Sequence, residues 1–167
     1  MSGLKRFLLG DPERISGGVY GTIMVMAVLA AGAKAYQHQL LRLLAIVAIT
    51  VLVLWLAHVY ARGIAESLQL GRRLNFSELL SLARHEYSIV AAAVLPVVAL
   101  AFGASHVLPE RSAVLLALWL GVVLLTAQGF RYARLEGLRG GAAVLAIATN
   151  LGIGLTLVAL EVWISHA

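Results

Sequence analysis

The chain has 167 residues, of which 61% are hydrophobic and only 13% are charged. Globular domains average about 25% charged residues, and a soluble chain of this length could not bury so much apolar surface. The sequence has no cysteine, which excludes disulfide bonds and thiol chemistry. Its formal charge is +5, and the placement of that charge says more than the sum.

Five long apolar stretches cover most of the chain. A helix needs about 20 mostly apolar residues to cross the ~30 Å core of a bilayer. Transmembrane spans are expected at about 16–34, 40–62, 87–106, 112–132 and 141–163. Backbone groups in lipid must be paired internally, and the apolar run 43–56 lacks the alternation of a barrel strand. The sequence therefore predicts an all-α, polytopic membrane helical bundle, with residues 1–167 forming a single transmembrane domain.

The first apolar stretch also has features of a signal peptide. Lys5 and Arg6 precede it, and residues 33–35 have the small-x-small pattern of a cleavage site. However, Asp11 and Glu13 lie where a signal peptide is positively charged. We therefore expect a retained first span.

The basic residues alternate between the two sides of the expected bundle. Ten of the thirteen fall on one side: Lys5, Arg6, Arg14, Arg62, Arg72, Arg73, Arg84, Arg131, Arg134 and Arg139. The other side has only Lys34, Arg42 and Arg111. Lys and Arg concentrate on the cytoplasmic side of membrane proteins. We expect a multi-pass protein of the bacterial inner (plasma) membrane, with a cytoplasmic N-terminus and an external C-terminus.

The longest connection, 63–86, mixes leucines with arginines. Ser77 or Asn75 is suited to cap a helix over 78–86. An amphipathic helix lying on the cytoplasmic surface is expected there. Its role is anchoring in one interpretation, and gating or partner docking in the other.

Small residues favour close helix contacts in two spans. Gly17 and Gly21 form a small-xxx-small pair in the first span, and Ala148 and Gly152 form another in the fifth. We expect these two helices to make the tightest contacts, either within one chain or between copies.

Three polar residues within the expected spans need an explanation, because polar groups in hydrocarbon are unfavourable. His58 is either a hydrogen-bonded interfacial histidine or a pH-sensitive gating group. Asn150 lies near the middle of the last span, where it can link helices by a hydrogen bond. Glu161 either reaches the outer surface or attracts cations at a pore mouth.

The geometry of an antiparallel hairpin brings further polar residues to the level of His58. Arg14, Ser16 and Tyr20 of the first span are expected at a depth similar to that of Trp55 and His58 in the second. Such a cluster can either lock the two helices together or form a cytoplasmic gate.

The same residues carry a resemblance to a known family. The segment 14–23 resembles the start of the lysosomal and bacterial potassium channels of the transmembrane-175 type, and Trp55-Leu-Ala-His58 resembles their Trp-x-x-His. The resemblance implies a pore lined by the first helix, with Thr22 where the first pore isoleucine stands. The departures are Ile15 for Phe, Gly17 for Asp, and five spans for six. The chain also resembles small actinobacterial integral membrane proteins.

Two functions remain open from the sequence. The first is an oligomeric cation channel or small transporter, with copies assembled around the first helix. The second is a non-catalytic accessory or scaffold subunit of a larger membrane complex. No enzyme is expected, because the sequence lacks paired carboxylates, metal-ligand spacing and a Gly-x-Ser-x-Gly elbow. We expect no cofactor, metal or nucleic-acid partner; the bilayer itself is the expected surrounding.

Overall fold

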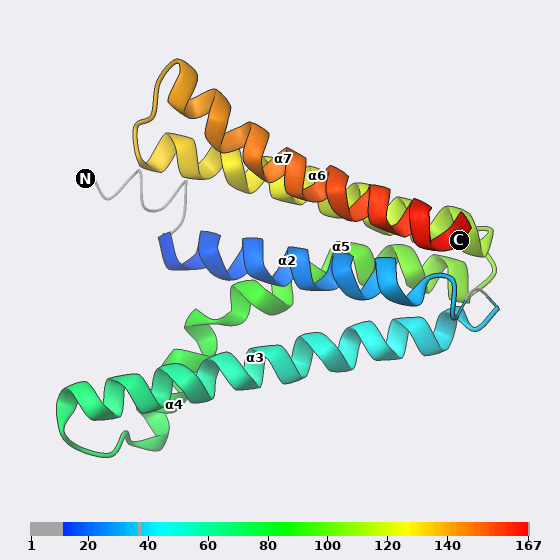
Figure 1. Cartoon of the computed structure of the whole chain (residues 1–167). Helices are drawn as coiled ribbons and strands as arrows, with labels where there is room; N and C mark the ends of the chain where they lie inside the picture. Colours follow the sequence, from blue (N-terminus) through cyan, green and yellow to red (C-terminus); the bar gives the residue numbers. More distant parts are fainter. Residues whose placement is uncertain (1–11, 37, 167) are drawn as a thin grey trace.

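The computed structural model describes residues 12–36 and 38–166, with side chains from Ile15 onward. This part of the chain forms six helices and no strand (Figure 1). They are α2 (Pro12–Gly32), α3 (Leu40–Leu70), α4 (Phe76–His85), α5 (Tyr87–Ala104), α6 (Glu110–Leu135) and α7 (Gly141–His166). All except α4 are long and apolar enough to cross a membrane. The predicted all-helical bundle with five long apolar helices is confirmed.

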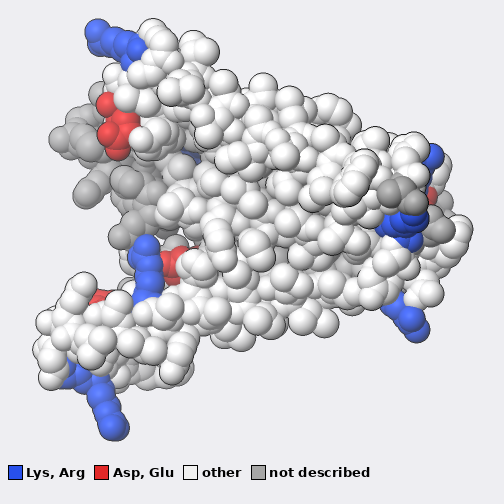
Figure 2. All heavy atoms as spheres, in the orientation of Figure 1, with Lys and Arg blue, Asp and Glu red and all other residues white. Residues whose placement is uncertain are grey.

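The five long helices run up and down along one bundle axis (Figure 1). We call the end at which α2, α5 and α7 begin the basic end, at the left of Figure 1, and the other the opposite end. The arginines on described side chains of the basic end are Arg62, Arg72, Arg73, Arg84, Arg131, Arg134 and Arg139. On the face shown in Figure 2, the coloured charged residues lie toward the two ends, and the wall between them shows none.

Helix α2 lies at the centre of the bundle and contacts α3, α5, α6 and α7. Its Val25, Met26 and Leu29 are fully buried, and they pack with Leu118 and Leu125 of α6 in one apolar core. Helix α7 lies at the periphery, and only its Gly154 and Glu161 are buried. The bundle therefore has one central helix and one weakly embedded outer helix.

The small residues of α2 meet a different helix from the one expected. A Cβ added to Gly21 would lie 2.7 Å from the carbonyl oxygen of Ile89, so Gly21 lets the α2 and α5 backbones approach. Gly17 also faces α5, at Ser88, whereas a Cβ added to Gly152 of α7 would have no atom within 4 Å. Within one chain the tightest contacts of these two helices are not with each other, because α5 occupies the glycine face of α2 and α7 packs mainly on α6. Tight contacts between copies stay a prediction.

Helix α3 is longer than the second span predicted from the sequence. It continues past 62 to Leu70, and its 31 residues give a length of about 46 Å. The continuation has no proline, and the helix ends only at Gly71, whose φ of 63° and N–H to the Leu68 carbonyl form a left-handed cap. The predicted span ends at Arg62 because its length was matched to the thickness of a bilayer core. A helix can be longer than that thickness, and α3 is.

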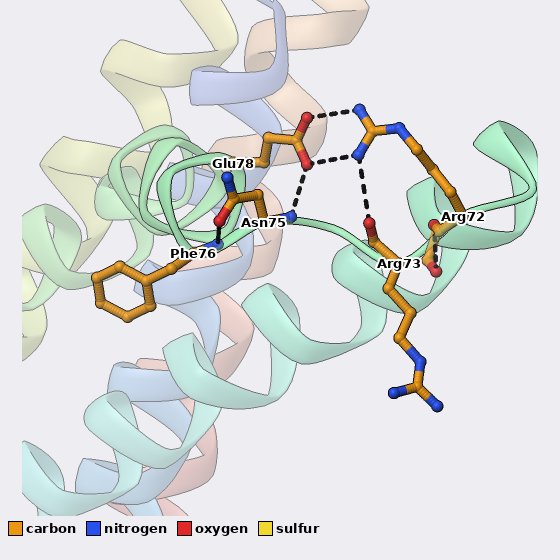
Figure 3. A network of polar contacts seen from close by, with 6 residues as sticks. Arg72, Arg73, Asn75, Phe76 and Glu78 are labelled. Atoms are coloured by element: carbon orange, nitrogen blue, oxygen red, sulfur yellow. Dashed lines mark hydrogen bonds and ion pairs between the residues drawn. The ribbon is translucent and has the colours of Figure 1, made fainter.

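A polar network fixes the turn between α3 and α4 (Figure 3). Of the two capping residues considered, Asn75 is the cap: its Oδ1 accepts from the Phe76 N–H at 2.6 Å, and Glu78 Oε2 accepts from the Asn75 N–H at 2.7 Å. Arg72 Nη2 donates to Glu78 Oε1 at 2.7 Å. The hydrogen bond from Arg72, followed by that from the Asn75 backbone, lowers the pKa of Glu78 to about 2.

Candidate functional site

Helices α2, α6 and α7 share an interface, which we call the seam, and a pocket lies at each end of it. The three helices line the pocket at the basic end, whereas α6, α7, the connection after α2 and the first residue of α3 line the other. The pocket at the basic end has a volume of about 460 Å³ and contains Asn150. The pocket at the opposite end has a volume of about 440 Å³ and contains Glu161. We refer to them as the Asn150 pocket and the Glu161 pocket.

The Asn150 pocket is a mainly apolar hollow with a few polar groups. Its lining residues are Ile15, Ser16, Val19, Tyr20, Ile23, Gln128, Tyr132, Leu135, Glu136, Asn150 and Ile153. Gly18 makes room for Gln128, because an added Cβ would lie 2.8 Å from Gln128 Nε2. The Oε1 atom of Gln128 is buried and has no hydrogen-bond partner among the described residues. This pocket therefore contains an unsatisfied acceptor, which is rare in folded proteins.

Asn150 does not make the interhelical hydrogen bond expected for it in the described part of the chain. Its Nδ2 donates to the Ala146 carbonyl of its own helix at 3.0 Å. The side chain packs instead on Gly129 of α6, where an added Cβ would lie 3.1 Å from Asn150 Cβ. Asn150 thus marks a close approach between α6 and α7.

The Glu161 pocket is more polar. Its lining residues are Ala33, Lys34, His38, Leu40, Glu110, Arg111, Val114, Glu161, Ser165 and His166. Glu161 is only 8% exposed, so it lies beneath the surface. Among the described residues it has no hydrogen bond or ion pair, while Lys34 and Arg111 are exposed on the same pocket. Glu161 is therefore a largely covered carboxylate in the pocket wall, with no partner among the described residues.

Packed apolar side chains separate the two pockets. Met26 fills the space beside Gly121, where an added Cβ would lie 2.6 Å from the Met26 sulfur. Leu157 and Val158 of α7 pack against the same core. Along α7, Ile153 of one pocket and Glu161 of the other are about 12 Å apart at 1.5 Å per residue. The seam is therefore closed in the middle and hollow at both ends.

The cluster expected around His58 is only partly assembled. The rings of Tyr20 and His58 are in contact, with centroids 4.9 Å apart. Trp55 instead donates from Nε1 to the Ala83 carbonyl of α4 at 3.1 Å. Ser16 lies on the Asn150 pocket, and Arg14 is in α2 but its side chain lies outside the described residues.

Two other candidate residues have local partners. His58 Nδ1 lies 3.2 Å from the Leu54 carbonyl of its own helix, as in the hydrogen-bonded interpretation. A gating role for His58 stays a prediction. Thr22 is fully buried and its hydroxyl donates to the Gly18 carbonyl at 2.8 Å. Thr22 therefore faces the interior of its own bundle.

One ion pair at the basic end was missed from the sequence. Glu86, in the turn between α4 and α5, is 4% exposed, and its Oε1 lies 2.7 Å from Arg62 Nε. The signal in the sequence was Glu86, immediately before the expected span 87–106, together with Arg62 at the end of the expected span 40–62. This pair joins α3, eight residues before its end, to the turn that precedes α5.

Within 12–36 and 38–166, no three histidine, aspartate or glutamate side chains converge to hold a metal ion. Comparison with protein-family models, with curated proteins and with solved structures finds no match to this chain.

Proposed function

We propose that this chain is a small membrane transport protein that carries a solute along the α2/α6/α7 seam. The observation that carries the proposal is the pair of pockets, about 460 and 440 Å³, at opposite ends of one three-helix interface. A path closed in the middle and open at both ends fits a carrier that changes conformation better than a permanently open pore.

The peripheral position of α7 supports this proposal. A carrier must rearrange one group of helices against another. Helix α7 buries only two residues, and its contacts with α6 include close approaches at Gly129 and Gly154. Among the five long helices it buries the fewest residues, so we propose α7 as the moving helix, with its contact to α6 as the surface along which it shifts.

The bilayer is the proposed surrounding, and the basic end is proposed to face the cytoplasm. Seven arginines with described side chains lie at that end, against Lys34, Arg42 and Arg111 at the other. The positive-inside rule then places the N-terminus in the cytoplasm and the C-terminus outside, in a bacterial inner membrane. The Asn150 pocket would open toward the cytoplasm and the Glu161 pocket toward the exterior.

The experiment is uptake by proteoliposomes that contain the purified chain. Tracers are Rb⁺ and a set of small amines, carboxylates and amino acids, with empty liposomes as the baseline. A Gly129→Cys/Asn150→Cys pair is designed to lock α6 to α7, because a Cβ added to Gly129 would lie 3.1 Å from Asn150 Cβ. A small outward shift reaches the roughly 3.5–4.5 Å of a disulfide, and the chain has no other cysteine. We expect the oxidised pair to block uptake, and reduction to restore it.

The two single cysteine variants are the controls, and they should be insensitive to oxidant. Uptake that continues through the oxidised double variant would contradict movement at the α6/α7 contact. Absence of uptake of every tracer would overturn the transport proposal.

The oligomeric cation channel expected from the sequence is the second candidate. It requires the first helix to line a pore between copies, whereas α2 contacts four helices of its own chain. Rb⁺ flux that persists in the oxidised double variant, from a homo-oligomer measured in mild detergent, would favour the channel. A fixed partner in place of flux would favour the accessory subunit, and the exposed Ala148 and Gly152 of α7 offer it a contact face.

A further inference from the structure

We propose that the Glu161 pocket binds a small zwitterionic solute, whose ammonium group pairs with Glu161 and whose carboxylate meets Lys34 and Arg111. As a substrate assignment, this inference rests on the proposed transport function. The binding itself can be measured without any flux.

The first observation is the burial of Glu161. Only 8% of its surface is exposed, it lines the pocket, and no donor in the described part of the chain bonds to its carboxylate. An ionised carboxylate taken out of water is strongly unfavourable unless a cation or several donors compensate it. The pocket beside it is the place from which such a cation can approach.

The second observation is the position of the pocket's own cations. Lys34 follows the end of α2 and Arg111 lies in the first turn of α6, whereas Glu161 is on α7. Both cations are exposed, and neither forms an ion pair with Glu161. Negative charge is therefore buried in the pocket wall and positive charge lies at its exposed margin. A ligand that satisfies both must have an ammonium group and an anionic group on one small molecule.

The remaining lining residues favour an organic ligand over a metal ion. No three of the described carboxylates and imidazoles converge on one point, although Glu110, His38 and His166 line the same pocket. The Nδ1 atom of His166 lies 2.7 Å from the Val162 carbonyl of its own helix, so that nitrogen is already engaged. Ca²⁺ and Mg²⁺ are coordinated by about six or more oxygen atoms from protein and water together. The described residues offer no converging set of protein ligands for such an ion.

The size and the apolar part of the pocket agree with an aliphatic zwitterion. Its volume of about 440 Å³ is within the range of small-ligand sites. Ala33, Leu40 and Val114 supply apolar surface beside the charged groups. An amino acid with a branched aliphatic side chain matches both kinds of lining.

Three probes with the same branched aliphatic group test this chemistry: L-leucine, 3-methylbutylamine, which lacks the carboxylate, and 4-methylpentanoate, which lacks the ammonium group. Their affinities for the full chain are measured by calorimetry in detergent, where no gradient exists. L-leucine should bind most tightly, the amine at least about 10-fold more weakly, and the acid more weakly still, because each charged contact contributes to the affinity. Equal affinity of the acid and L-leucine, or no binding of any probe, would overturn the proposal.

Matched variants assign the contacts. Glu161→Gln should weaken L-leucine and the amine by about 10-fold or more, and Glu66→Gln on α3 is its control. Arg111→Gln should weaken L-leucine toward the affinity of the amine, with Lys34 keeping part of the carboxylate contact, and should not weaken the amine. Arg42→Gln is its control. Because Arg111 is exposed, its variant decides the question even if Glu161→Gln fails to fold. Unchanged L-leucine affinity in Arg111→Gln, or in a folded Glu161→Gln, would refute the assignment.

The outcomes separate this inference from the transport proposal. Binding of L-leucine without its uptake would preserve the site and remove transport of this ligand. Uptake of other tracers without binding of any of the three probes would preserve transport and remove the zwitterion site.

Discussion

Arg62 and Glu86 form an ion pair between α3 and the turn that begins α5, with Nε and Oε1 2.7 Å apart. The Glu86 side chain is 5% exposed and that of Arg62 is 39% exposed. The two partners are therefore unequal: the arginine retains access to water or lipid head groups, and the carboxylate does not. A buried charge that loses its partner is more unfavourable than an exposed one.

This asymmetry predicts different effects for the two single substitutions. Arg62→Met should lower the free energy of unfolding by about 3–5 kcal/mol, because Glu86 is left buried without its cation. Glu86→Gln should lower it by only about 1–2 kcal/mol, since the neutral amide tolerates burial. Both are measured by SDS titration of the purified chain.

The double variant Arg62→Met/Glu86→Gln is the control for coupling. It should recover most of the stability lost in Arg62→Met, because no charge is then buried alone. Losses that simply add would show that the two side chains contribute independently.

The α3–α4 turn should show a pH dependence set by Glu78. Its carboxyl has a pKa of about 2 in the folded chain, below the ordinary value of 4.5. A lowered folded-state pKa stabilises the turn above about pH 4.5, and this contribution is lost as the pH falls toward 2. An NMR titration of the Glu78 carboxyl carbon should have its midpoint near 2.

Arg72→Met should raise that midpoint, because the largest cause of the low pKa is the hydrogen bond from Arg72. Arg73→Met is the matched control: Arg73 contributes only its backbone carbonyl to the network, as acceptor for Arg72 Nη1 at 3.2 Å (Figure 3). A midpoint that stays near 2 in Arg72→Met would contradict the assignment.

Gly21 and Gly152, each of which follows a small residue by four positions, should respond differently to alanine. Gly21→Ala places a Cβ against the Ile89 carbonyl and should destabilise the bundle by about 1–3 kcal/mol through overpacking. In Gly152→Ala the new methyl group meets nothing within 4 Å, and the change should be within about 0.5 kcal/mol or slightly stabilising. Thermal unfolding of the two variants in one detergent compares them. Equal losses would indicate that α2 is not held against α5 by close backbone contact.

The sequence predicts the five long helices well because hydropathy and length are local properties of each segment. It does not reveal which helix packs against Gly21. A small residue marks the side of a helix that can be approached closely, but the neighbour on that side depends on the packing of the whole bundle. The burial of Glu161 is equally hidden, because it depends on how the ends of α2, α6 and α7 converge. Tyr20 and His58 could be paired from antiparallel depth alone, whereas Trp55 found its partner on α4, which depth does not encode.

The orientation of the bundle gives the last prediction. With seven of the described arginines at the basic end, we expect that end to face the cytoplasm. The chain has no cysteine, so single-cysteine variants give a clean readout. In intact cells, a membrane-impermeant maleimide should label Ser105→Cys and spare Ser77→Cys, because these exposed residues lie at the opposite and basic ends. Labelling of Ser77→Cys alone would invert the orientation, and equal labelling of both would contradict a crossing by α5, the long helix between them.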